Sequence, residues 1–290
     1  MGKEITRITN NTLNLLSIAA LSDVYKDHLL LGARGIEKVR TNRFGDTALV
    51  GDYRAEEIII NAVRQHKIPI RIISEEHGTI DLGDKYLGIL DGLDGSNRYL
   101  AYINGDKRAR YGTMFSIFKG SDPKYDDVIS SGIMEHPSDT LFFLNGNKAF
   151  GRNLSTGVTT RLYTSGRTNL DESTRTIINT HSEAPFHHLA RELVDELPKE
   201  FEHYCLLSTE AAFVDLISGR ADLVIEWTRK NNLEFAVAYG LIKAAGGVML
   251  DSNGNSIGPQ KYLSFEQKEY SMIVCASTLD LARSFLKSLE

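Results

Sequence analysis

The sequence has little cysteine, no long apolar run and no excess of positive charge. Its 290 residues include only two cysteines, Cys205 and Cys275, which provide neither a disulfide framework nor a thiolate metal site. No apolar run approaches the roughly twenty residues of a membrane span, and the amino-terminal residues lack the apolar core of a signal peptide. The formal net charge of −5 argues against a nucleic-acid-binding protein. We therefore expect a soluble protein of the reducing cytoplasm, without a nucleic-acid or membrane partner.

The composition supports a large packed core, because 42% of the residues are hydrophobic and only 24% are charged. Apolar residues with helical spacing predict an amphipathic helix over residues 11–31, with Leu29 among its apolar positions. Around residues 151–160 the composition turns to Gly, Asn, Ser and Thr, which suggests two halves, 1–155 and 156–290. The second half alternates predicted strands (176–180, 203–207, 221–226, 248–250, 271–276) with predicted helices (185–197, 209–218, 234–245, 278–289). Such alternation indicates helices that cover a sheet.

The segment from Leu90 to Asn97 carries the clearest chemical signal. A short apolar strand is predicted to end at Asp91, and Asp94 follows in a glycine-bounded turn. Two carboxylates three residues apart in such a turn can direct oxygen ligands at one point, which suits Mg²⁺ or Mn²⁺. An ordinary turn rich in Asp, Gly, Ser and Asn is the alternative.

A second predicted strand ends in acids upstream of this segment. The run Ile70–Ile73 is followed closely by Glu75. If both strands deliver their acids to the same place, Glu75, Asp91 and Asp94 share one site. Repulsion among three such carboxylates is relieved by a bound cation.

These two acidic segments give the chain a family resemblance. They read Ser-Glu-Glu at 74–76 and Leu-Asp-Gly-Leu-Asp-Gly-Ser at 90–96. The combination resembles the inositol monophosphatase superfamily, whose hallmark is an acidic pair followed by Asp-Pro-Ile/Leu-Asp-Gly-Thr/Ser. That superfamily includes archaeal-type fructose-1,6-bisphosphatases and nucleotide 3′-phosphate phosphatases. The resemblance implies an α/β (α+β) fold, the layered αβαβα sandwich of sugar phosphatases, and a homodimer.

The resemblance also implies roles for individual residues. Two or three Mg²⁺ ions, with Mn²⁺ as a substitute, would be held by the carbonyl of Leu93 and four carboxylates: Glu75, Asp91, Asp94 and Glu234. Glu234 stands where the family has Asp, and an acid in a first helical turn also suits the helix dipole without any metal. Glu75, Ser96 and Asp52 are the implied catalytic residues, because Ser96 and Asp52 would orient and deprotonate the attacking water.

Two of these candidates have a plainer interpretation. Asp52 lies at the start of a predicted helix, where an ordinary N-cap is the alternative to a contact with the attacking water. Glu226 ends a predicted strand, where it is either a strand-end acid or, by the resemblance, the group that binds a substrate hydroxyl.

Two predicted helix starts are candidate phosphate sites. One lies at Gly95 and Ser96, and the other at Ser208, a plausible N-cap for the helix over 209–218. Helix N-termini bind anions because their first N–H groups have no partner within the helix. A basic loop lies between these segments, and it either binds a second phosphate or is simply solvated: Lys107, Arg108 and Arg110.

We therefore expect a Mg²⁺-dependent phosphatase that hydrolyses a small phosphate monoester with a metal-activated water. Inositol monophosphate and fructose 1,6-bisphosphate are the leading substrates, and a 3′-phosphoadenosine 5′-phosphate phosphatase is the enzymatic alternative. Gly92 replaces the family's Pro and would loosen the metal-binding turn. Glu234 is a second departure, and Tyr204, which stands where many members of the family have Arg, is a third. Together the three leave open a catalytically weak regulator that binds metal or a sugar phosphate.

Overall fold

The structure is a computed structural model that describes residues 8–42, 45, 47–180, 187–196, 203–204, 208–228, 232–262 and 270–289. Its helices are α1 (Asn10–Leu31), α2 (Val50–Gln65), α3 (Ser96–Ile103), α4 (His187–Glu196), α5 (Thr209–Ile217), α6 (Leu233–Ala244) and α7 (Leu279–Lys287), with 3-10 turns at η1 (Gly32–Ile36) and η2 (Tyr125–Asp127). In the described part of the chain, no helix combines the length and hydropathy needed to cross a membrane.

Two sheets organise the molecule. The larger has eight strands in the order β10-β9-β8-β7-β6-β5-β3-β4, which are β3 (Ile70–Ser74), β4 (Gly78–Asp81), β5 (Tyr86–Asp94), β6 (Gly112–Lys119), β7 (Val128–Glu135), β8 (Thr140–Asn145), β9 (Lys148–Asn153) and β10 (Thr159–Arg161). The smaller has the order β12-β11-β13-β15-β14, formed by β11 (Thr176–Ile178), β12 (His203–Tyr204), β13 (Leu223–Trp227), β14 (Val248–Asp251) and β15 (Met272–Ala276). A separate pair joins β1 (Lys38–Thr41) to β2 (Thr47–Leu49).

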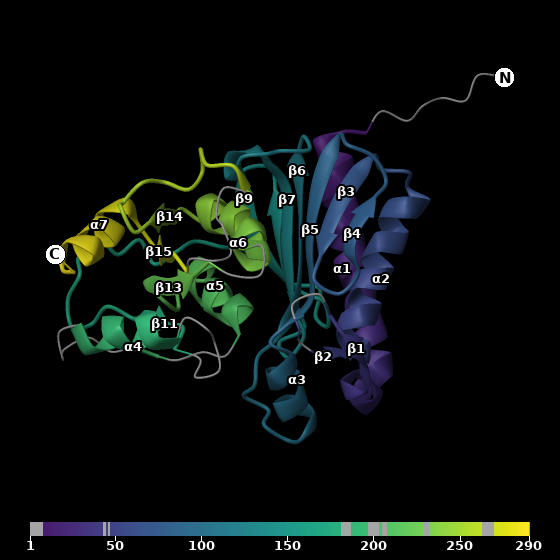
Figure 1. The fold of residues 1–290 in the computed structure, drawn as a ribbon, viewed down its shortest axis with the longest axis horizontal. Helices are drawn as coiled ribbons and strands as arrows, with labels where there is room; N and C mark the ends of the chain where they lie inside the picture. Colours follow the sequence, from purple (N-terminus) through teal and green to yellow (C-terminus); the bar gives the residue numbers. More distant parts are fainter. Residues whose placement is uncertain are drawn as a thin grey trace.

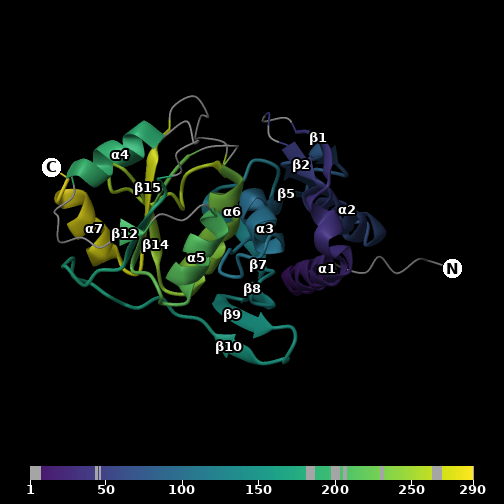
Figure 2. The same ribbon diagram turned by 90° about the horizontal axis from the view of Figure 1, so that it is seen from below.

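Helices and sheets alternate in layers across the molecule (Figures 1 and 2). Helices α1 and α2 cover one face of the large sheet, α5 and α6 lie between the two sheets, and α4 and α7 cover the far face of the small sheet. Each boundary between layers is filled by its own apolar cluster, because the helices on either side bury apolar side chains against the sheets. The expected αβαβα sandwich is confirmed.

Helix α1 shows how the sequence pattern becomes packing. Thr9 caps its start by accepting a hydrogen bond from the Thr12 N–H at 3.2 Å, and Gly32 follows its last residue with a positive φ of 49°. Leu13 and Val24 are buried, as their helical spacing predicts. The prediction that Leu29 belongs to the apolar face is wrong, because Leu29 is 60% exposed.

Other boundaries differ from those predicted. The central strand β5 runs through Asp94 rather than ending at Asp91, and its nine residues are all buried between β3 and β6. Of the strand predicted over 203–207, only 203–204 lies within the described residues. The large sheet continues through β10, past residue 155, and the division of the chain into two halves stays a prediction.

Candidate metal centre and active site

Three buried carboxylates from two distant parts of the chain meet at one point. Asp91 and Asp94 belong to the end of β5, and Glu234 lies in the first turn of α6. Each can offer a carboxylate oxygen that lies within 4.8 Å of those of the other two. They meet because α6 packs across the face of the large sheet that carries β5 (Figure 1). Hard oxygen ligands at this spacing fit Mg²⁺ or Mn²⁺.

A bulge in β5 explains how both aspartates reach the same side. Residues three apart in a regular strand point to opposite faces, because side chains alternate with a period of two. Asp91 pairs with Met114 and Asp94 with Gly112, so β5 has one more residue than β6 between these pairs. The extra residue shifts the alternation and turns both carboxylates toward α6. The predicted glycine-bounded turn is therefore a strand bulge.

Gly92 has a steric role within this bulge. A Cβ atom at this position would lie 2.4 Å from the carbonyl oxygen of Asp52 and 2.9 Å from Cγ of Glu56. Helix α2 therefore approaches β5 too closely for any side chain here. Because Gly92 lies in a strand and is not among the glycines with positive φ, the structure gives close packing, rather than a loosened turn, as the reason for this glycine.

Asp52 links the start of α2 to the metal segment. It is the third residue of α2 rather than its N-cap, and its Oδ2 accepts a hydrogen bond from the Leu49 N–H at 2.9 Å. Its Oδ1 lies 3.0 Å from Ser96 Oγ, which is also 3.2 Å from the Leu93 carbonyl oxygen. Burial, together with the charge of Glu75, raises the pKa of Asp52 well above its ordinary value. The N-cap interpretation of Asp52 is therefore wrong, although Asp52 does stabilise the start of α2, and its contact with the attacking water stays a prediction.

Glu75 lies beside this group without joining the three-carboxylate cluster. It directly follows β3, is 8% exposed, and influences Asp52 through its charge. Its main-chain N–H donates to the Leu90 carbonyl at 3.2 Å, which continues the parallel pairing of β3 with β5. The ends of β3 and β5 are neighbours as predicted, but Glu75 is not part of the Asp91–Asp94–Glu234 cluster, and its role as a ligand stays a prediction.

Glu56 is an important residue that the sequence analysis missed. It is fully buried, and its carboxylate accepts hydrogen bonds from the N–H groups of Glu76 and His77 at 3.0–3.1 Å and from the Ser74 hydroxyl. These contacts hold the turn that presents Glu75. The sequence did carry a signal for a buried role of Glu56, because this acid lies on the apolar face of a predicted helix, one turn after Asp52.

The N-terminus of α5 reaches the metal segment. Ser208 is its N-cap and accepts a hydrogen bond from the Ala211 N–H at 3.3 Å. The Glu210 N–H donates to Asp94 Oδ2 at 2.6 Å, so the first turn of α5 already stabilises an anionic group. Gly95 precedes α3 with a φ of +90°, and a Cβ there would lie 3.0 Å from Ser208 Cβ. The two predicted phosphate sites are therefore adjacent.

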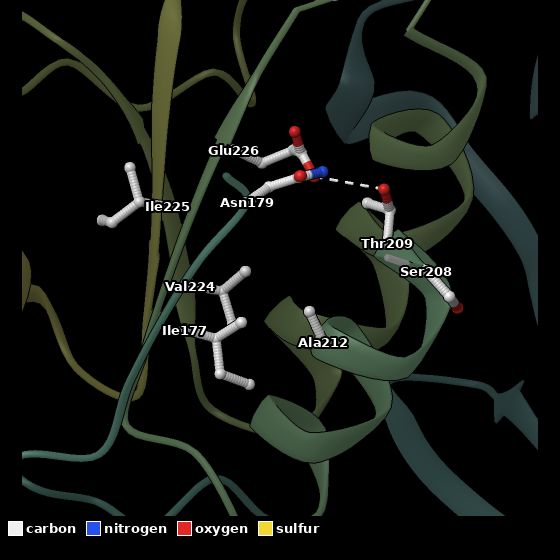
Figure 3. A pocket seen from close by; sticks show the side chains of 8 residues that line it. All are labelled: Ile177, Asn179, Ser208, Thr209, Ala212, Val224, Ile225 and Glu226. Atoms are coloured by element: carbon white, nitrogen blue, oxygen red, sulfur yellow. Dashed lines mark hydrogen bonds between the residues drawn. The ribbon is translucent and has the colours of Figure 1, made fainter. Parts of the chain in front are cut away.

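Glu226 lies on the other side of the first turn of α5, in a small pocket between α5 and β13 (Figure 3). Its Oε2 accepts hydrogen bonds from Asn179 Nδ2 at 2.7 Å and from Thr209 Oγ1 at 3.1 Å. Figure 3 shows Thr209 facing Glu226 while Ser208 points away. The apolar part of the pocket is formed by Ile177, Ala212 and Val224. The sequence analysis missed Asn179 and Thr209, which carried no motif.

The basic loop divides into two parts. Arg110 is bound within the protein, because it donates to Glu135 at 2.6 Å and to Asp215 at 2.8 Å. Lys107 and Arg108 are exposed, and Arg108 is 96% exposed at its side chain. Arg110 therefore joins β7 to α5, and Lys107 and Arg108 are the exposed basic side chains of this loop.

Glu210 is another buried acid that the sequence analysis missed, and no motif in the sequence marked it. It is fully buried, and Ser208 Oγ lies 3.0 Å from its Oε2. Burial and the nearby charge of Glu135 raise the pKa of Glu210 well above its ordinary value. Its side chain lies at the junction of α5 with the large sheet, close to Asp94.

Comparisons with known proteins agree with this geometry. The model of the inositol monophosphatase family matches residues 15–284. A fructose-1,6-bisphosphatase/inositol-1-monophosphatase of Thermococcus kodakarensis is 32% identical over 115 residues, which cover 39% of this chain and 42% of that protein. A fructose-1,6-bisphosphatase of Pyrococcus furiosus is 25% identical over 262 residues, which cover 88% and 89% of the two chains.

Solved structures share the fold. An extragenic suppressor protein of Bartonella henselae has a TM-score of 0.73 and 17% identity, with 95% of this chain and 97% of that chain covered. The fructose-1,6-bisphosphatase of Leishmania major has a TM-score of 0.72 and 16% identity, with 100% and 97% covered. The match over nearly the whole sequence, the layered fold and the carboxylate cluster lead to one conclusion. The chain belongs to the inositol monophosphatase family, whose members are metal-dependent phosphatases.

Proposed function

We propose that this protein hydrolyses a small phosphate monoester in a Mg²⁺-dependent reaction, with inositol monophosphate and fructose 1,6-bisphosphate as the leading substrates. The observation that carries the proposal is the meeting of Asp91, Asp94 and Glu234 oxygens within 4.8 Å, beside the N-termini of α3 and α5. The carboxylates suit a hard cation, and the adjacent helix N-termini suit a phosphate. Both relatives matched in sequence are named for fructose 1,6-bisphosphate, and that of Thermococcus kodakarensis is also named for inositol 1-monophosphate.

In this proposal each residue has a defined task. The cation, when bound, stabilises negative charge and lowers the pKa of a water molecule. The ligands would be the three clustered carboxylates, the Leu93 carbonyl and Glu75. Asp52, whose pKa is raised by burial and by Glu75, is suited to accept a proton through the Ser96 hydroxyl at its Oδ1. Glu226 would accept a hydrogen bond from a substrate hydroxyl.

The test is a panel of phosphate esters assayed with Mg²⁺, with Mn²⁺ and with excess chelator. The panel contains inositol monophosphate, fructose 1,6-bisphosphate and 3′-phosphoadenosine 5′-phosphate. We expect turnover of at least one of the first two esters, which chelator abolishes. Turnover that persists in excess chelator, or turnover of the adenosine ester alone, would contradict the proposal.

Asp91→Asn tests the site itself. Removing one carboxylate ligand should abolish measurable turnover at millimolar Mg²⁺, because the charge of the cluster falls. Asp81→Asn is the matched control, since Asp81 lies on β4 and pairs only weakly with Arg71 at 3.3 Å on the surface. Equal loss in both variants would point to a general effect of charge rather than to metal binding.

Two observations bear on the alternatives. The regulator hypothesis drew in part on Gly92 and Glu234. Gly92 allows the close approach of α2 to β5, and Glu234 belongs to the carboxylate cluster. Neither residue therefore favours an inactive protein, so the regulator hypothesis now rests on Tyr204, which stands where many members of the family have Arg. Since Arg110 is engaged with Glu135 and Asp215, Lys107 and Arg108 are the basic side chains of this loop that could contact the second phosphate of a bisphosphate. A homodimer is part of the proposal, and sedimentation velocity of the purified protein checks it.

A further inference from the structure

A buried hydrogen-bond chain ends on the main chain of the metal segment. Thr113, the second residue of β6, donates its hydroxyl proton to the Gly92 carbonyl oxygen at 2.7 Å. Thr113 Oγ1 also lies 3.0 Å from His136 Nε2. Thr113 is 0% exposed and His136 is 4% exposed, so water does not compete for either hydrogen bond.

The direction of this chain follows from the chemistry of its members. A carbonyl oxygen only accepts hydrogen bonds, so the single Thr113 hydroxyl proton points at Gly92. The Thr113 oxygen must then accept from His136, which places the ring proton of His136 on Nε2. Among the described residues, His136 Nδ1 has no hydrogen-bond partner, as fits a nitrogen without a proton in an apolar setting. Burial lowers the pKa of His136 well below 6.5, so the ring is neutral.

The ring of His136 is itself held in place. It stacks on His28 of α1 with ring centroids 4.0 Å apart. His28 Nε2 lies 3.1 Å from the hydroxyl of Tyr111, which directly precedes β6. His136 directly follows β7, and its ring is the group that donates to Thr113. Contacts from α1 and from the start of β6 therefore fix the orientation of this ring.

The hydrogen bonds from His136 through Thr113 end on the peptide group between Gly92 and Leu93. The peptide bond between Gly92 and Leu93 has its carbonyl bonded to Thr113, and its N–H donates to Asp91 Oδ1 at 3.0 Å. The bulge interrupts the regular pairing of β5 with β6 between Asp91 and Asp94, so the Thr113 side chain bonds a carbonyl at the irregular position. A rotation of this peptide plane would break the hydrogen bond to the Asp91 carboxylate and change the φ angle of Leu93, whose carbonyl follows.

We propose that Thr113 and His136 are positioning residues that set the metal ligands of β5 by fixing the orientation of the Gly92–Leu93 peptide. This inference rests on the proposed metal role of Asp91 and Leu93. Neither Thr113 nor His136 touches the metal or the substrate. Their effect is to keep the Asp91 carboxylate and the Leu93 carbonyl aimed at the same point before a cation arrives, so that binding requires less rearrangement.

The test compares Thr113→Val with Thr113→Ser. Val has nearly the same shape as Thr but no hydroxyl, whereas Ser keeps the hydroxyl and loses a methyl group. We expect Thr113→Val to weaken Mn²⁺ binding, measured by titration calorimetry, by about 10-fold, a typical loss for a group behind the ligands. Thr113→Ser should bind Mn²⁺ within about 2-fold of wild type, because the hydrogen bond remains.

Thr164→Val is the matched control. Thr164 Oγ1 also donates to a main-chain carbonyl, that of Ser277, at 3.0 Å, but it lies near the C-terminal end of α6, opposite Glu234. Both Val variants should lower the melting temperature, while only Thr113→Val should weaken Mn²⁺ binding. Mn²⁺ binding by Thr113→Val equal to that of wild type overturns the inference.

Two further outcomes are distinguishable. If the wild-type protein binds no Mn²⁺, the proposed function fails, and the positioning role of Thr113 fails with it. If Thr113→Val does not fold, His136→Phe tests the same chain from its other end, since Phe keeps the stacking on His28 and removes the Nε2 donor. Weaker Mn²⁺ binding by His136→Phe supports the inference, and unchanged binding overturns it.

Discussion

Asp52 accepts hydrogen bonds from two different elements, one at each carboxylate oxygen. The Leu49 N–H belongs to the start of α2, and the Ser96 hydroxyl belongs to the start of α3. The first contact stabilises a helix end, and the second connects the carboxylate to the residue that follows the metal segment. Because the two contacts use different oxygens, their effects on stability and on rate can be separated.

Asp52→Asn and Ser96→Ala should each lower kcat by about 10²- to 10⁴-fold, since a positioned proton acceptor typically contributes that much. Their double mutant should lose little more than either single mutant, because the two groups act as one unit. The measurement is kcat at saturating Mg²⁺, with the melting temperature recorded for each variant. Asp280→Asn is the control, as Asp280 is an acid in the first turn of α7, away from the site. Independent multiplication of the two losses would contradict the prediction.

Four helices begin at the site, and their starts explain much of its electrostatics. Asp52, Ser96, Glu210 and Glu234 lie in the first turns of α2, α3, α5 and α6. Their N–H groups and dipoles favour negative charge, which partly offsets the repulsion among the acids and suits a phosphate. The packing of α2 against β5 is close, because there is no room for a Cβ atom at Gly92.

Gly92→Ala should therefore destabilise the protein by about 1–3 kcal/mol, the usual cost of overpacking a core. The obstacle is the main-chain oxygen of Asp52 at 2.4 Å, which cannot rotate away as a flexible side chain would. Urea denaturation measures the change. Gly151→Ala, on β9, is the matched control, because its Cβ atom would meet its nearest neighbours at an ordinary 3.5 Å. Equal stability of the two variants would show that α2 can shift.

The whole molecule carries a pH dependence that originates outside the carboxylate cluster. Burial lowers the pKa of His28 to about 4, with a smaller opposing effect from Asp27, and lowers that of its stacking partner His136 as well. Tyr99 and Tyr111 enclose the same ring. In the unfolded chain these histidines bind protons near pH 6.5, whereas in the folded protein they resist protonation.

The sign of the effect follows from these directions. Above pH 6.5 both states are neutral at His28 and no stability is lost, while between pH 6.5 and about 4 the unfolded state binds more protons. The contribution of His28 alone should lower the free energy of unfolding by about 3 kcal/mol over this range. The buried acids Asp52 and Glu210 contribute with the opposite sign, because their pKa values are raised in the folded protein, so the His28 effect is read from the comparison of variants. Urea denaturation of His28→Phe should show a shallower fall than wild type, and His66→Gln, at an exposed helix end, an unchanged one. A slope for His28→Phe equal to that of wild type would contradict this account.

Local patterns were sufficient to predict much of the fold. The helical spacing of Leu13 and Val24 predicted α1, and the apolar runs that end in Glu75 and Asp91 predicted β3, β5 and the acidic site between them. Such patterns are reliable because hydrophobic periodicity and capping act over a few neighbouring residues. The sequence by itself therefore determined that helices cover a sheet and that acids end two neighbouring strands, whereas the αβαβα sandwich and the proposed ligand roles came from the family resemblance.

Only the tertiary structure decided which polar groups face one another. The bulge that turns Asp91 and Asp94 to one side, the burial of Glu56 beneath Glu75, and the pairing of Arg110 with Glu135 all depend on contacts between elements far apart in the chain. A buried polar group must find a hydrogen-bond partner, but nothing in the local sequence identifies that partner. Packing of the helices against both faces of the large sheet makes that choice, and it thereby gives the acidic motif its geometry.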